Sequence, residues 1–405
     1  MIPRLKPFLD RSELWASWRP SPDAVQRFEC EFAKAFGGHH GIAFPYGRTA
    51  MRALLESLQI RDQEIILPAY TCVVVAHAIV LSGNRCRFVD ATLTDYNMNL
   101  DQVEAAIGQR TAGIVPTHLF GYPLDLDRFD QIVDAAERRL GRKLLIVHDC
   151  AHSFGARWRG RLVTAERDAA LFGLGISKLM TSVFGGMLVT GDERLAARLR
   201  AWREARVTGG SIHRWVRRLY LLATYAAFDP RLYGLVRWIE SETPLLDRLT
   251  KAYHLDDCIR FPPDADGVMT DVEAQVGLAQ LKKYDEVVAR RVAHARYYAA
   301  HLSDVEQWRL PPLVDGATYS HYVVRVPDRG GEMSRFLRAG VQVGQLIDYS
   351  VPHMKSYAPI SGPGEWPNSL MLSQHLINLP VHADLTDAER ARVVEIAREE
   401  GRKAA

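Results

Sequence analysis

The sequence predicts an α/β fold, with a large domain built on a mostly parallel central sheet flanked by helices and a smaller C-terminal α+β domain. Between residues 41 and 190, short apolar runs alternate with longer segments of helical spacing. This order is typical of helices packed on a parallel sheet. The chain also has 405 residues, which exceeds the size of one typical core and favours two domains.

Apolar runs predict the strands of the sheet. Six runs are short, rich in Ile, Val and Leu, and mostly without alternation, as buried strands are. They are 64–69, 86–91, 112–120, 143–149, 169–175 and 186–192. Helical spacing separates several of them, at 49–58, 100–107 and 125–140.

The second half of the chain has a different predicted secondary structure, with long helical segments and few strands. Residues 270–302 read as one long amphipathic helix, 320–328 as a strand, and 385–401 as a helix opened by a Thr386 cap. We place the large domain at 1–290, with a helical insertion at about 205–260, and the small domain at 291–405.

Composition excludes several classes of protein. The net charge is only +3, so no nucleic-acid partner is expected. The first residues do not resemble a secretory signal, and no apolar run is long enough to span a membrane. The cysteines are scattered and odd in number, which favours neither disulfides nor a metal site and indicates a reducing compartment, the cytoplasm. They are Cys30, Cys72, Cys86, Cys150 and Cys258.

Asp149 is the first candidate for chemistry. It closes the apolar run 143–149, so its carboxylate is expected at the carboxyl edge of the sheet, where open α/β sheets bind ligands. A carboxylate there can pair with a protonated ring nitrogen and make a heteroaromatic ring an electron sink. Taken alone, the residue is more simply a helix N-cap.

Lys178 is the second candidate. It follows the next apolar run, within the glycine-rich segment GLGISKLMTSVFGG. Glycines let the backbone approach a ligand closely, and a desolvated lysine amine is free for imine formation. Taken alone, the residue is more simply an ordinary surface lysine.

The third candidate is the segment Gly47-Arg48-Thr49-Ala50, which precedes the first predicted helix of the sheet. Free backbone N–H groups at a helix start form an anion site, and the side chains of Arg48 and Thr49 could add donors. Simple capping of the helix explains the segment about as well.

In this order the three candidates resemble a fold-type I enzyme dependent on pyridoxal 5′-phosphate (PLP), and more narrowly the DegT/DnrJ/EryC1/StrS family of sugar aminotransferases. The segments DCAHSFGA (149–156) and SKLMTSVFGG (177–186), with their spacing, are the specific part. YGRTAMRALLESLQI (46–60) and MTDVEAQVGLAQLKKYDEVVARR (269–291) add to the resemblance.

The resemblance implies a role for individual residues. Lys178 holds the cofactor and moves the proton as general base and acid, Asp149 pairs with the pyridine nitrogen, and His152 lies beside the phenolic oxygen. His118, in PTHLFG, is expected near the site. The family works as homodimers in which the partner completes each site. The residues expected to contact the cofactor are Gly47, Arg48, Thr49, Cys72, Asp149, His152, Ser177 and Lys178.

Several positions depart from the family pattern. Gly173 replaces a phosphate-binding Ser, and Cys72 replaces the aromatic ring that stacks on the cofactor. Asp266 and Val268 stand where the partner chain has Asn and Arg. An Asp beside the phosphate would repel it, which Arg48 could offset. These departures leave the lysine chemistry intact and bear on the substrate.

Residues 211–250 form an insertion that is basic and rich in Trp, Tyr and Leu. That composition is typical of a helix lying in a membrane interface, so peripheral membrane contact is one interpretation. A helical hairpin over the active site or at the dimer contact is the other, and we favour it slightly.

The expected activity is transfer of an amino group from an amino acid, glutamate by resemblance, to a nucleotide-linked keto-sugar, in the biosynthesis of lipopolysaccharide, another cell-surface polysaccharide or a secondary metabolite. An alternative acceptor is a non-nucleotide or lipid-linked ketone. A sugar dehydratase is disfavoured, because the family's dehydratases carry His in place of the lysine. A second alternative is a non-catalytic PLP-fold protein at a membrane or in regulation.

Overall fold

A seven-stranded sheet forms the centre of the computed structural model, which describes residues 1–19, 21–206, 212–229, 233 and 258–399. Its strand order is β1-β9-β8-β5-β4-β2-β3. β8, β5, β4, β2 and β3 run parallel, and β9 is antiparallel to both of its neighbours, β1 and β8. The predicted mostly parallel sheet is therefore confirmed. Its strands are β1 (His40–Phe44), β2 (Glu64–Pro68), β3 (Arg85–Val89), β4 (Thr111–Ile114), β5 (Leu145–Asp149), β8 (Ala169–Gly173) and β9 (Gly186–Thr190).

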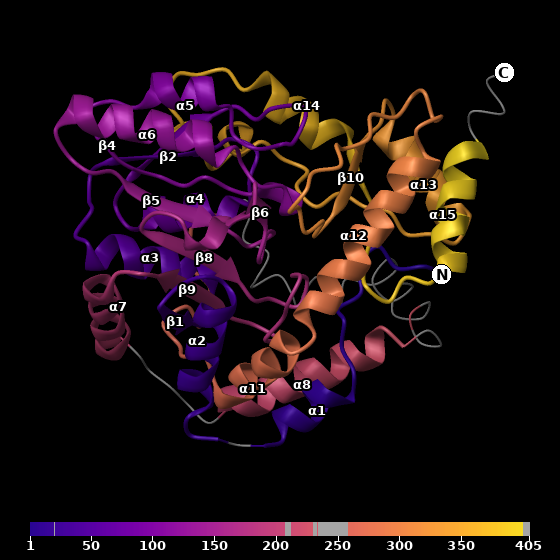
Figure 1. Cartoon of the computed structure of the whole chain (residues 1–405), viewed down its shortest axis with the longest axis horizontal. Helices are drawn as coiled ribbons and strands as arrows, with labels where there is room; N and C mark the ends of the chain where they lie inside the picture. Colours follow the sequence, from indigo (N-terminus) through magenta and orange to yellow (C-terminus); the bar gives the residue numbers. More distant parts are fainter. Residues whose placement is uncertain (20, 207–211, 230–232, 234–257, 400–405) are drawn as a thin grey trace.

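Helices cover both faces of this sheet (Figure 1). Successive strand residues point to opposite faces, so Val147 packs with α3, α4 and α7, whereas Ile146 packs with α5 and α6. α2 and α11 cover that second face beneath β1, β9 and β8. These helices are α2 (Ala24–Ala35), α3 (Gly47–Ser57), α4 (Val73–Leu81), α5 (Leu100–Ala106), α6 (Leu126–Leu140), α7 (Glu193–Arg206) and α11 (Asp271–Leu281).

Among the strands and helices of the sheet layer, β1, α2, α4 and α7 were not predicted. The segment VVVAHAIVL (73–81) forms the helix α4 although its β-branched residues favour a strand. α4 is buried against the sheet, and tertiary burial overrides weak intrinsic propensity. The strand predicted at 112–120 is shorter than expected, since β4 ends at Ile114 and a 3₁₀ turn, Leu119–Gly121, follows.

The single helix predicted over 270–302 is wrong. α11 ends at Leu281, and a new helix, α12 (Tyr284–His301), begins after Lys283. Lys283 leaves the helical conformation, and its ammonium group lies 2.7 Å from the buried carboxylate of Glu13. The periodicity of one segment cannot reveal such a partner, because Glu13 lies in a different helix, α1 (Arg11–Ser17).

The C-terminal part packs around the antiparallel pair β10 (Tyr322–Arg325) and β11 (Leu376–Leu379). Thr386 caps the last helix as predicted, accepting a hydrogen bond from the Glu389 amide at 3.2 Å. The domain boundary at 290/291 stays a prediction and falls within α12. The helices here are α13 (Arg329–Arg338), α14 (Pro367–His375) and α15 (Asp387–Glu399), and the remaining short elements are β6 (Arg157–Trp158), β7 (Arg161–Leu162) and the 3₁₀ turns Val163–Ala165 and Val351–His353.

Part of the insertion is helical, as predicted: α8 (Ile212–Ala227) packs beside α1 and α11 at the lower edge of the molecule (Figure 1). Residues 230–232 and 234–250 of the insertion lie outside the described residues. Within the described part of the chain, none of the helices is both long enough and apolar enough to cross a membrane.

Candidate active site

A pocket of about 350 Å³ lies at the carboxyl ends of β5 and β8, beside the start of α3. It brings together seven of the eight predicted site residues, namely Gly47, Arg48, Cys72, Asp149, His152, Ser177 and Lys178. The eighth, Thr49, is buried and donates its hydroxyl to the Ala265 carbonyl at 3.0 Å. The side chain of Thr49 is thereby withdrawn from the pocket, and the expectation that it adds a donor there fails.

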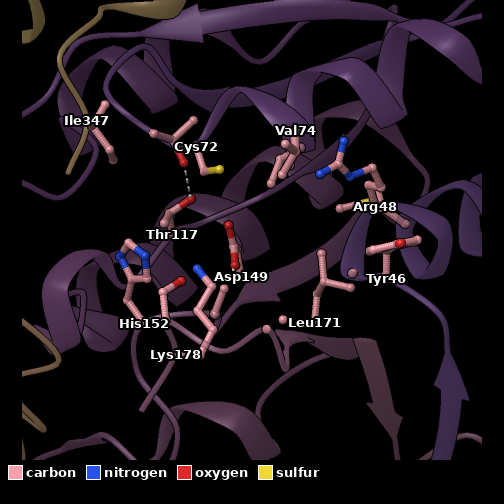
Figure 2. Close-up of a pocket in the computed structure, with 18 of the residues that line it drawn as sticks. Tyr46, Arg48, Cys72, Val74, Thr117, Asp149, His152, Leu171, Lys178 and Ile347 are labelled. Carbon is pink, nitrogen blue, oxygen red and sulfur yellow. Dashed lines mark hydrogen bonds between the residues drawn. The ribbon is translucent and has the colours of Figure 1, made fainter. Parts of the chain in front are cut away.

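Asp149 lies at the floor of this pocket (Figure 2). As the last residue of β5, it points to the same face of the sheet as Val147, toward α3 and α4. Its carboxylate accepts one hydrogen bond, from the Ala151 amide at 3.1 Å. Burial raises the pKa of Asp149, and the charge of Lys178 opposes that rise. A cation bound in the pocket would therefore stabilise the ionised carboxylate.

Lys178 projects from a loop that folds back on itself between β8 and β9. Both ends of the loop meet: the Leu174 amide donates to the Gly185 carbonyl, and the Ser182 amide donates to the Leu174 carbonyl, each at 2.9 Å. Val183 has φ +77°, a strained conformation for a β-branched residue and one that concentrates at functional sites. The loop thus holds the half-buried lysine amine toward Asp149 (Figure 2).

The start of α3 forms the other end of the pocket. Gly47 and Arg48 are the first helical residues, so their backbone N–H groups have no partner within the helix. Arg48 Nη1 is buried without a hydrogen-bond partner among the described residues, and its guanidinium lies 5.7 Å from the centre of the Tyr46 ring. A half-buried cation with an unpaired, buried nitrogen beside a helix N-terminus is suited to an anion such as a phosphate.

Gly186 permits this arrangement, because β9 passes directly beneath the start of α3. A Cβ atom at Gly186 would lie 2.3 Å from both the Gly47 nitrogen and the Tyr46 carbonyl carbon. Both neighbours are backbone atoms, which cannot rotate away. No side chain larger than hydrogen fits there without displacing the anion site.

We expect Gly186→Ala to lower the free energy of unfolding by about 1–3 kcal/mol, as overpacking does, and to weaken cofactor binding. Gly191→Ala is the control, because a Cβ at Gly191 would meet only the His39 ring, at 3.8 Å. Chemical denaturation with and without PLP measures both effects. Equal behaviour of the two variants would show that β9 does not constrain the start of α3.

His152 lines the opposite wall of the pocket. Its ring stacks on Phe120 with centroids 6.0 Å apart, and it lies 5.2 Å from the ring of His321. Burial and the nearby charge of Lys178 lower the pKa of His152 well below its usual value, so the ring is neutral. Its Nδ1 atom accepts a long bond of 3.5 Å from the Phe120 amide, which leaves Nε2–H as the donor available to a ligand.

His321 was not predicted as a site residue, because its segment SHYVVRVPD indicates only a strand. The residue is buried, and its Nδ1 atom lies 3.1 Å from the Ser320 hydroxyl. It belongs to the C-terminal part and reaches His152 only through the fold. Thr117 also lines the pocket, and its hydroxyl lies 3.4 Å from the Thr71 hydroxyl. It was not predicted as a site residue either.

His118 and Asp266, both considered from the sequence, lie outside the pocket, and so does Tyr70. His118 is fully buried, with Nε2 2.9 Å from Nδ1 of His148 and with Nδ1 accepting from the Leu124 amide, so it is a structural residue. Tyr70, near Cys72, donates its hydroxyl to the Ile347 carbonyl at 3.1 Å. Asp266 does not line the pocket of its own chain.

The insertion contributes to the surroundings of the site through Arg217 of α8. Its Nη2 lies 3.1 Å from Asp264, whose carboxylate also accepts from the Tyr46 hydroxyl at 2.7 Å. Its Nε lies 2.9 Å from Glu273, the residue that closes the capping box of α11. The Arg217 guanidinium also lies 4.3 Å from the Phe184 ring centre. Because Tyr46 and Phe184 line the pocket, α8 is connected to the site.

We expect Arg217→Met to lower the free energy of unfolding by about 3–5 kcal/mol, because it leaves the buried Glu273 carboxylate unpaired. Burial raises the pKa of Glu273 to about 7 even with Arg217 present, and losing Arg217 raises it further. Stability from such a raised pKa is present at low pH and lost as pH rises, so the deficit should grow above about pH 7.

Urea denaturation as a function of pH measures this deficit. Arg214→Met is the control: its 2.8 Å pair with Asp271 is also made to α11, but the Arg214 side chain is 53% exposed, which limits its contribution to about 1 kcal/mol. Glu273→Gln in the Arg217→Met background should recover part of the loss. A deficit independent of pH would contradict the assignment to Glu273.

Comparison with known proteins gives a consistent result. The model of the DegT/DnrJ/EryC1/StrS aminotransferase family matches residues 12–232 and 249–398. A dTDP-3-amino-3,4,6-trideoxy-alpha-D-glucose transaminase of Micromonospora megalomicea subsp. nigra is 30% identical over 386 residues, which is 93% of this chain and 89% of that protein.

Solved structures share the fold. The aminotransferase TlmJ from Streptoalloteichus hindustanus is 25% identical, with a TM-score of 0.77 and full coverage of both chains. Spr1654 from Streptococcus pneumoniae, solved in its PMP form, is 19% identical, with a TM-score of 0.79 and full coverage of both chains. The sugar aminotransferase CalS13 from Micromonospora echinospora is 23% identical, with a TM-score of 0.76, and covers 98% of this chain and 100% of its own.

Proposed function

Because this chain belongs to the DegT/DnrJ/EryC1/StrS aminotransferase family and has its fold-type I architecture, we propose that it is a PLP enzyme that transfers the amino group of glutamate to a nucleotide-linked keto-sugar. Membership of the family makes this chain a PLP-dependent sugar aminotransferase. The nucleotide-linked acceptor is supported by the relative from Micromonospora megalomicea, a dTDP-sugar transaminase, and glutamate is proposed by resemblance to the family.

The residues of the pocket fit PLP. One observation carries the proposal: Lys178 and Asp149 face one another, and the buried, unpartnered Arg48 Nη1 lies across the pocket beside the start of α3 (Figure 2). Arg48 and the backbone of Gly47 would hold the phosphate. Asp149 would pair with the ring nitrogen, and His152 would donate Nε2–H to the phenolic oxygen. Lys178 would attach the cofactor.

When bound, PLP supplies a ring that stabilises the negative charge left on a carbon atom as its proton departs. The residues of this chain do the remaining work. The Lys178 amine takes that proton and returns it at a neighbouring atom, as general base and then acid. The Asp149 carboxylate keeps a proton on the ring nitrogen. Neutral His152 holds the phenolic oxygen without adding a charge next to Lys178.

The acceptor is the less constrained part of the proposal. A nucleotide-linked keto-sugar is supported by the relative that acts in dTDP-sugar chemistry. A non-nucleotide ketone is the second candidate, motivated by the departures from the family pattern at Cys72, Gly173 and Asp266. Biosynthesis of a surface polysaccharide or a secondary metabolite would use either product.

We also propose that the enzyme works in the cytoplasm as a homodimer with shared sites. All five cysteines are free, which suits a reducing compartment. Asp266, which the family pattern assigns to the partner's site, pairs with Arg52 at 3.1 Å on the surface of its own chain, and this pairing would offset its repulsion of a phosphate. Sedimentation equilibrium measures the assembly, and a monomer with full activity would contradict shared sites.

Visible absorbance tests the proposed reaction. PLP added to the purified protein should give an absorption band that bleaches on addition of glutamate, and the aminated protein should then transfer its amine to a dTDP-linked keto-sugar. Aspartate and alanine serve as alternative donors, and free keto-sugars as alternative acceptors. A band that no amino donor changes would contradict aminotransferase chemistry, and transfer only to free ketones would favour the second candidate.

A further inference from the structure

Two helices present a joined apolar surface on the outside of the molecule. On α8, Arg217, Leu221 and Thr224 form the buried side. The opposite side exposes Trp215 and Leu219, by 56% and 63% of their areas. These exposed residues recur at the spacing that places them on one helical face.

The neighbouring helix α1 extends this surface. Trp15 and Trp18 are 66% and 51% exposed, and their spacing places them on one face with Arg11; Trp18 is the C-cap of α1, and Arg19 follows it. The Trp18 and Trp215 rings meet edge to face with centroids 5.9 Å apart, which joins the two helices. We call this surface the tryptophan face and define it by Trp15, Trp18, Trp215, Val216, Leu219 and Leu222.

The charge around the tryptophan face is positive. Arg218 lies between its two halves, 5.0 Å from the Trp18 ring centre and 5.3 Å from that of Trp215. Arg11, at the start of α1, and Arg19, two residues after its end, are both exposed. Among acidic groups on these two helices and on α11 beside them, Glu13 is buried against Lys283, and Asp271 pairs with Arg214.

Asp10 is the exposed carboxylate at the start of α1, and it lies 3.0 Å from Lys283. The arginines of the tryptophan face are therefore not matched by exposed carboxylates on the same helices. Two copies of this face brought together would place arginine against arginine, which is unfavourable. An anionic surface would satisfy the same charges.

We propose that the tryptophan face docks this enzyme onto the surface of a membrane containing anionic lipids. Tryptophan and leucine side chains enter the boundary between headgroups and acyl chains, while arginines contact lipid phosphates. The tryptophan face lies on the side of α8 opposite Arg217, so the helix itself separates this surface from the active-site pocket. The enzyme would thus be held at a membrane without any segment crossing it.

Flotation of the full-length, PLP-loaded enzyme tests this proposal, with vesicles of phosphatidylcholine alone or mixed with phosphatidylglycerol. The wild type should float with the mixed vesicles and be released by high salt. Leu219→Glu should reduce binding by about tenfold or more. Replacing Arg11 and Arg19 with Gln should reduce it by about fivefold per arginine. Leu337→Glu, at an exposed leucine of α13, should float like the wild type.

Each alternative outcome overturns the proposal. A wild-type enzyme that floats with neither kind of vesicle would show that the tryptophan face does not bind membranes. A Leu219→Glu variant that floats normally would place binding elsewhere. A Leu219→Glu variant that changes the oligomeric state in size-exclusion chromatography would identify the tryptophan face as a contact between copies. Activity on a water-soluble acceptor is expected to be unchanged in these variants, so this test is independent of the proposed reaction.

Discussion

Lys178→Ala is expected to reduce the rate of amino transfer by at least about 10³-fold, because it removes both the point of cofactor attachment and the general base. Stability should change little, since the lysine is only half-buried. The half-reaction with glutamate, followed by absorbance in single-turnover experiments, measures the loss directly. It also separates chemistry from binding and product release.

Lys355→Ala is the control for Lys178→Ala, because Lys355 is exposed and does not line the pocket. The control should transfer the amine at the wild-type rate. Circular dichroism should show both variants folded. A Lys178→Ala enzyme that retains more than about a tenth of the wild-type rate would contradict the assigned role, since loss of a general base alone costs about 10²-fold or more.

Asp149→Asn is expected to give the second largest effect, a fall of about 10²–10³-fold in the same half-reaction. An amide cannot hold the ring nitrogen in its protonated form, so the stabilisation of negative charge is lost; removing one preorganised electrostatic group of this kind typically has an effect of that size. Asp168→Asn is the matched control, because Asp168 is another carboxylate whose pKa is raised by burial. Asp168 lies at the amino end of β8, away from the pocket, and should be dispensable for the reaction.

The stability of Asp149→Asn should distinguish a functional carboxylate from a structural one. Burial raises the pKa of Asp149 in the folded protein, so without cofactor the ionised carboxylate reduces stability as the pH rises through that pKa. Asparagine has no charge to bury. We therefore expect the cofactor-free variant to be at least as stable as the wild type at neutral pH, and a clear loss of stability there would indicate a structural role.

Local sequence patterns predicted the central sheet and the position of the lysine loop. Asp149 and Lys178 each follow an apolar strand, and the carboxyl ends of parallel strands meet at one edge of a sheet. Arg48 was predictable for a similar reason, since it lies at the start of the helix predicted over 49–58. In each case the signal lies within a few residues of the side chain concerned.

The remaining features depend on contacts between distant segments. His321 reaches His152 from the C-terminal part, and Arg217 reaches Asp264 from the insertion. Lys283, at the break between α11 and α12, pairs with Glu13 of α1. The Thr49 hydroxyl is not available as the predicted side-chain donor, because it donates to the Ala265 carbonyl. None of these partners is visible in the local pattern around the residue it affects.

The most direct test of the central claim is to locate the bound cofactor. The PLP-loaded enzyme would be reduced with sodium borohydride, digested and analysed by peptide mass spectrometry. Our account predicts one modified peptide, carrying the pyridoxyl group on Lys178 within the segment between β8 and β9. A modification on another lysine, or an unmodified Lys178 in enzyme that has bound PLP, would contradict it.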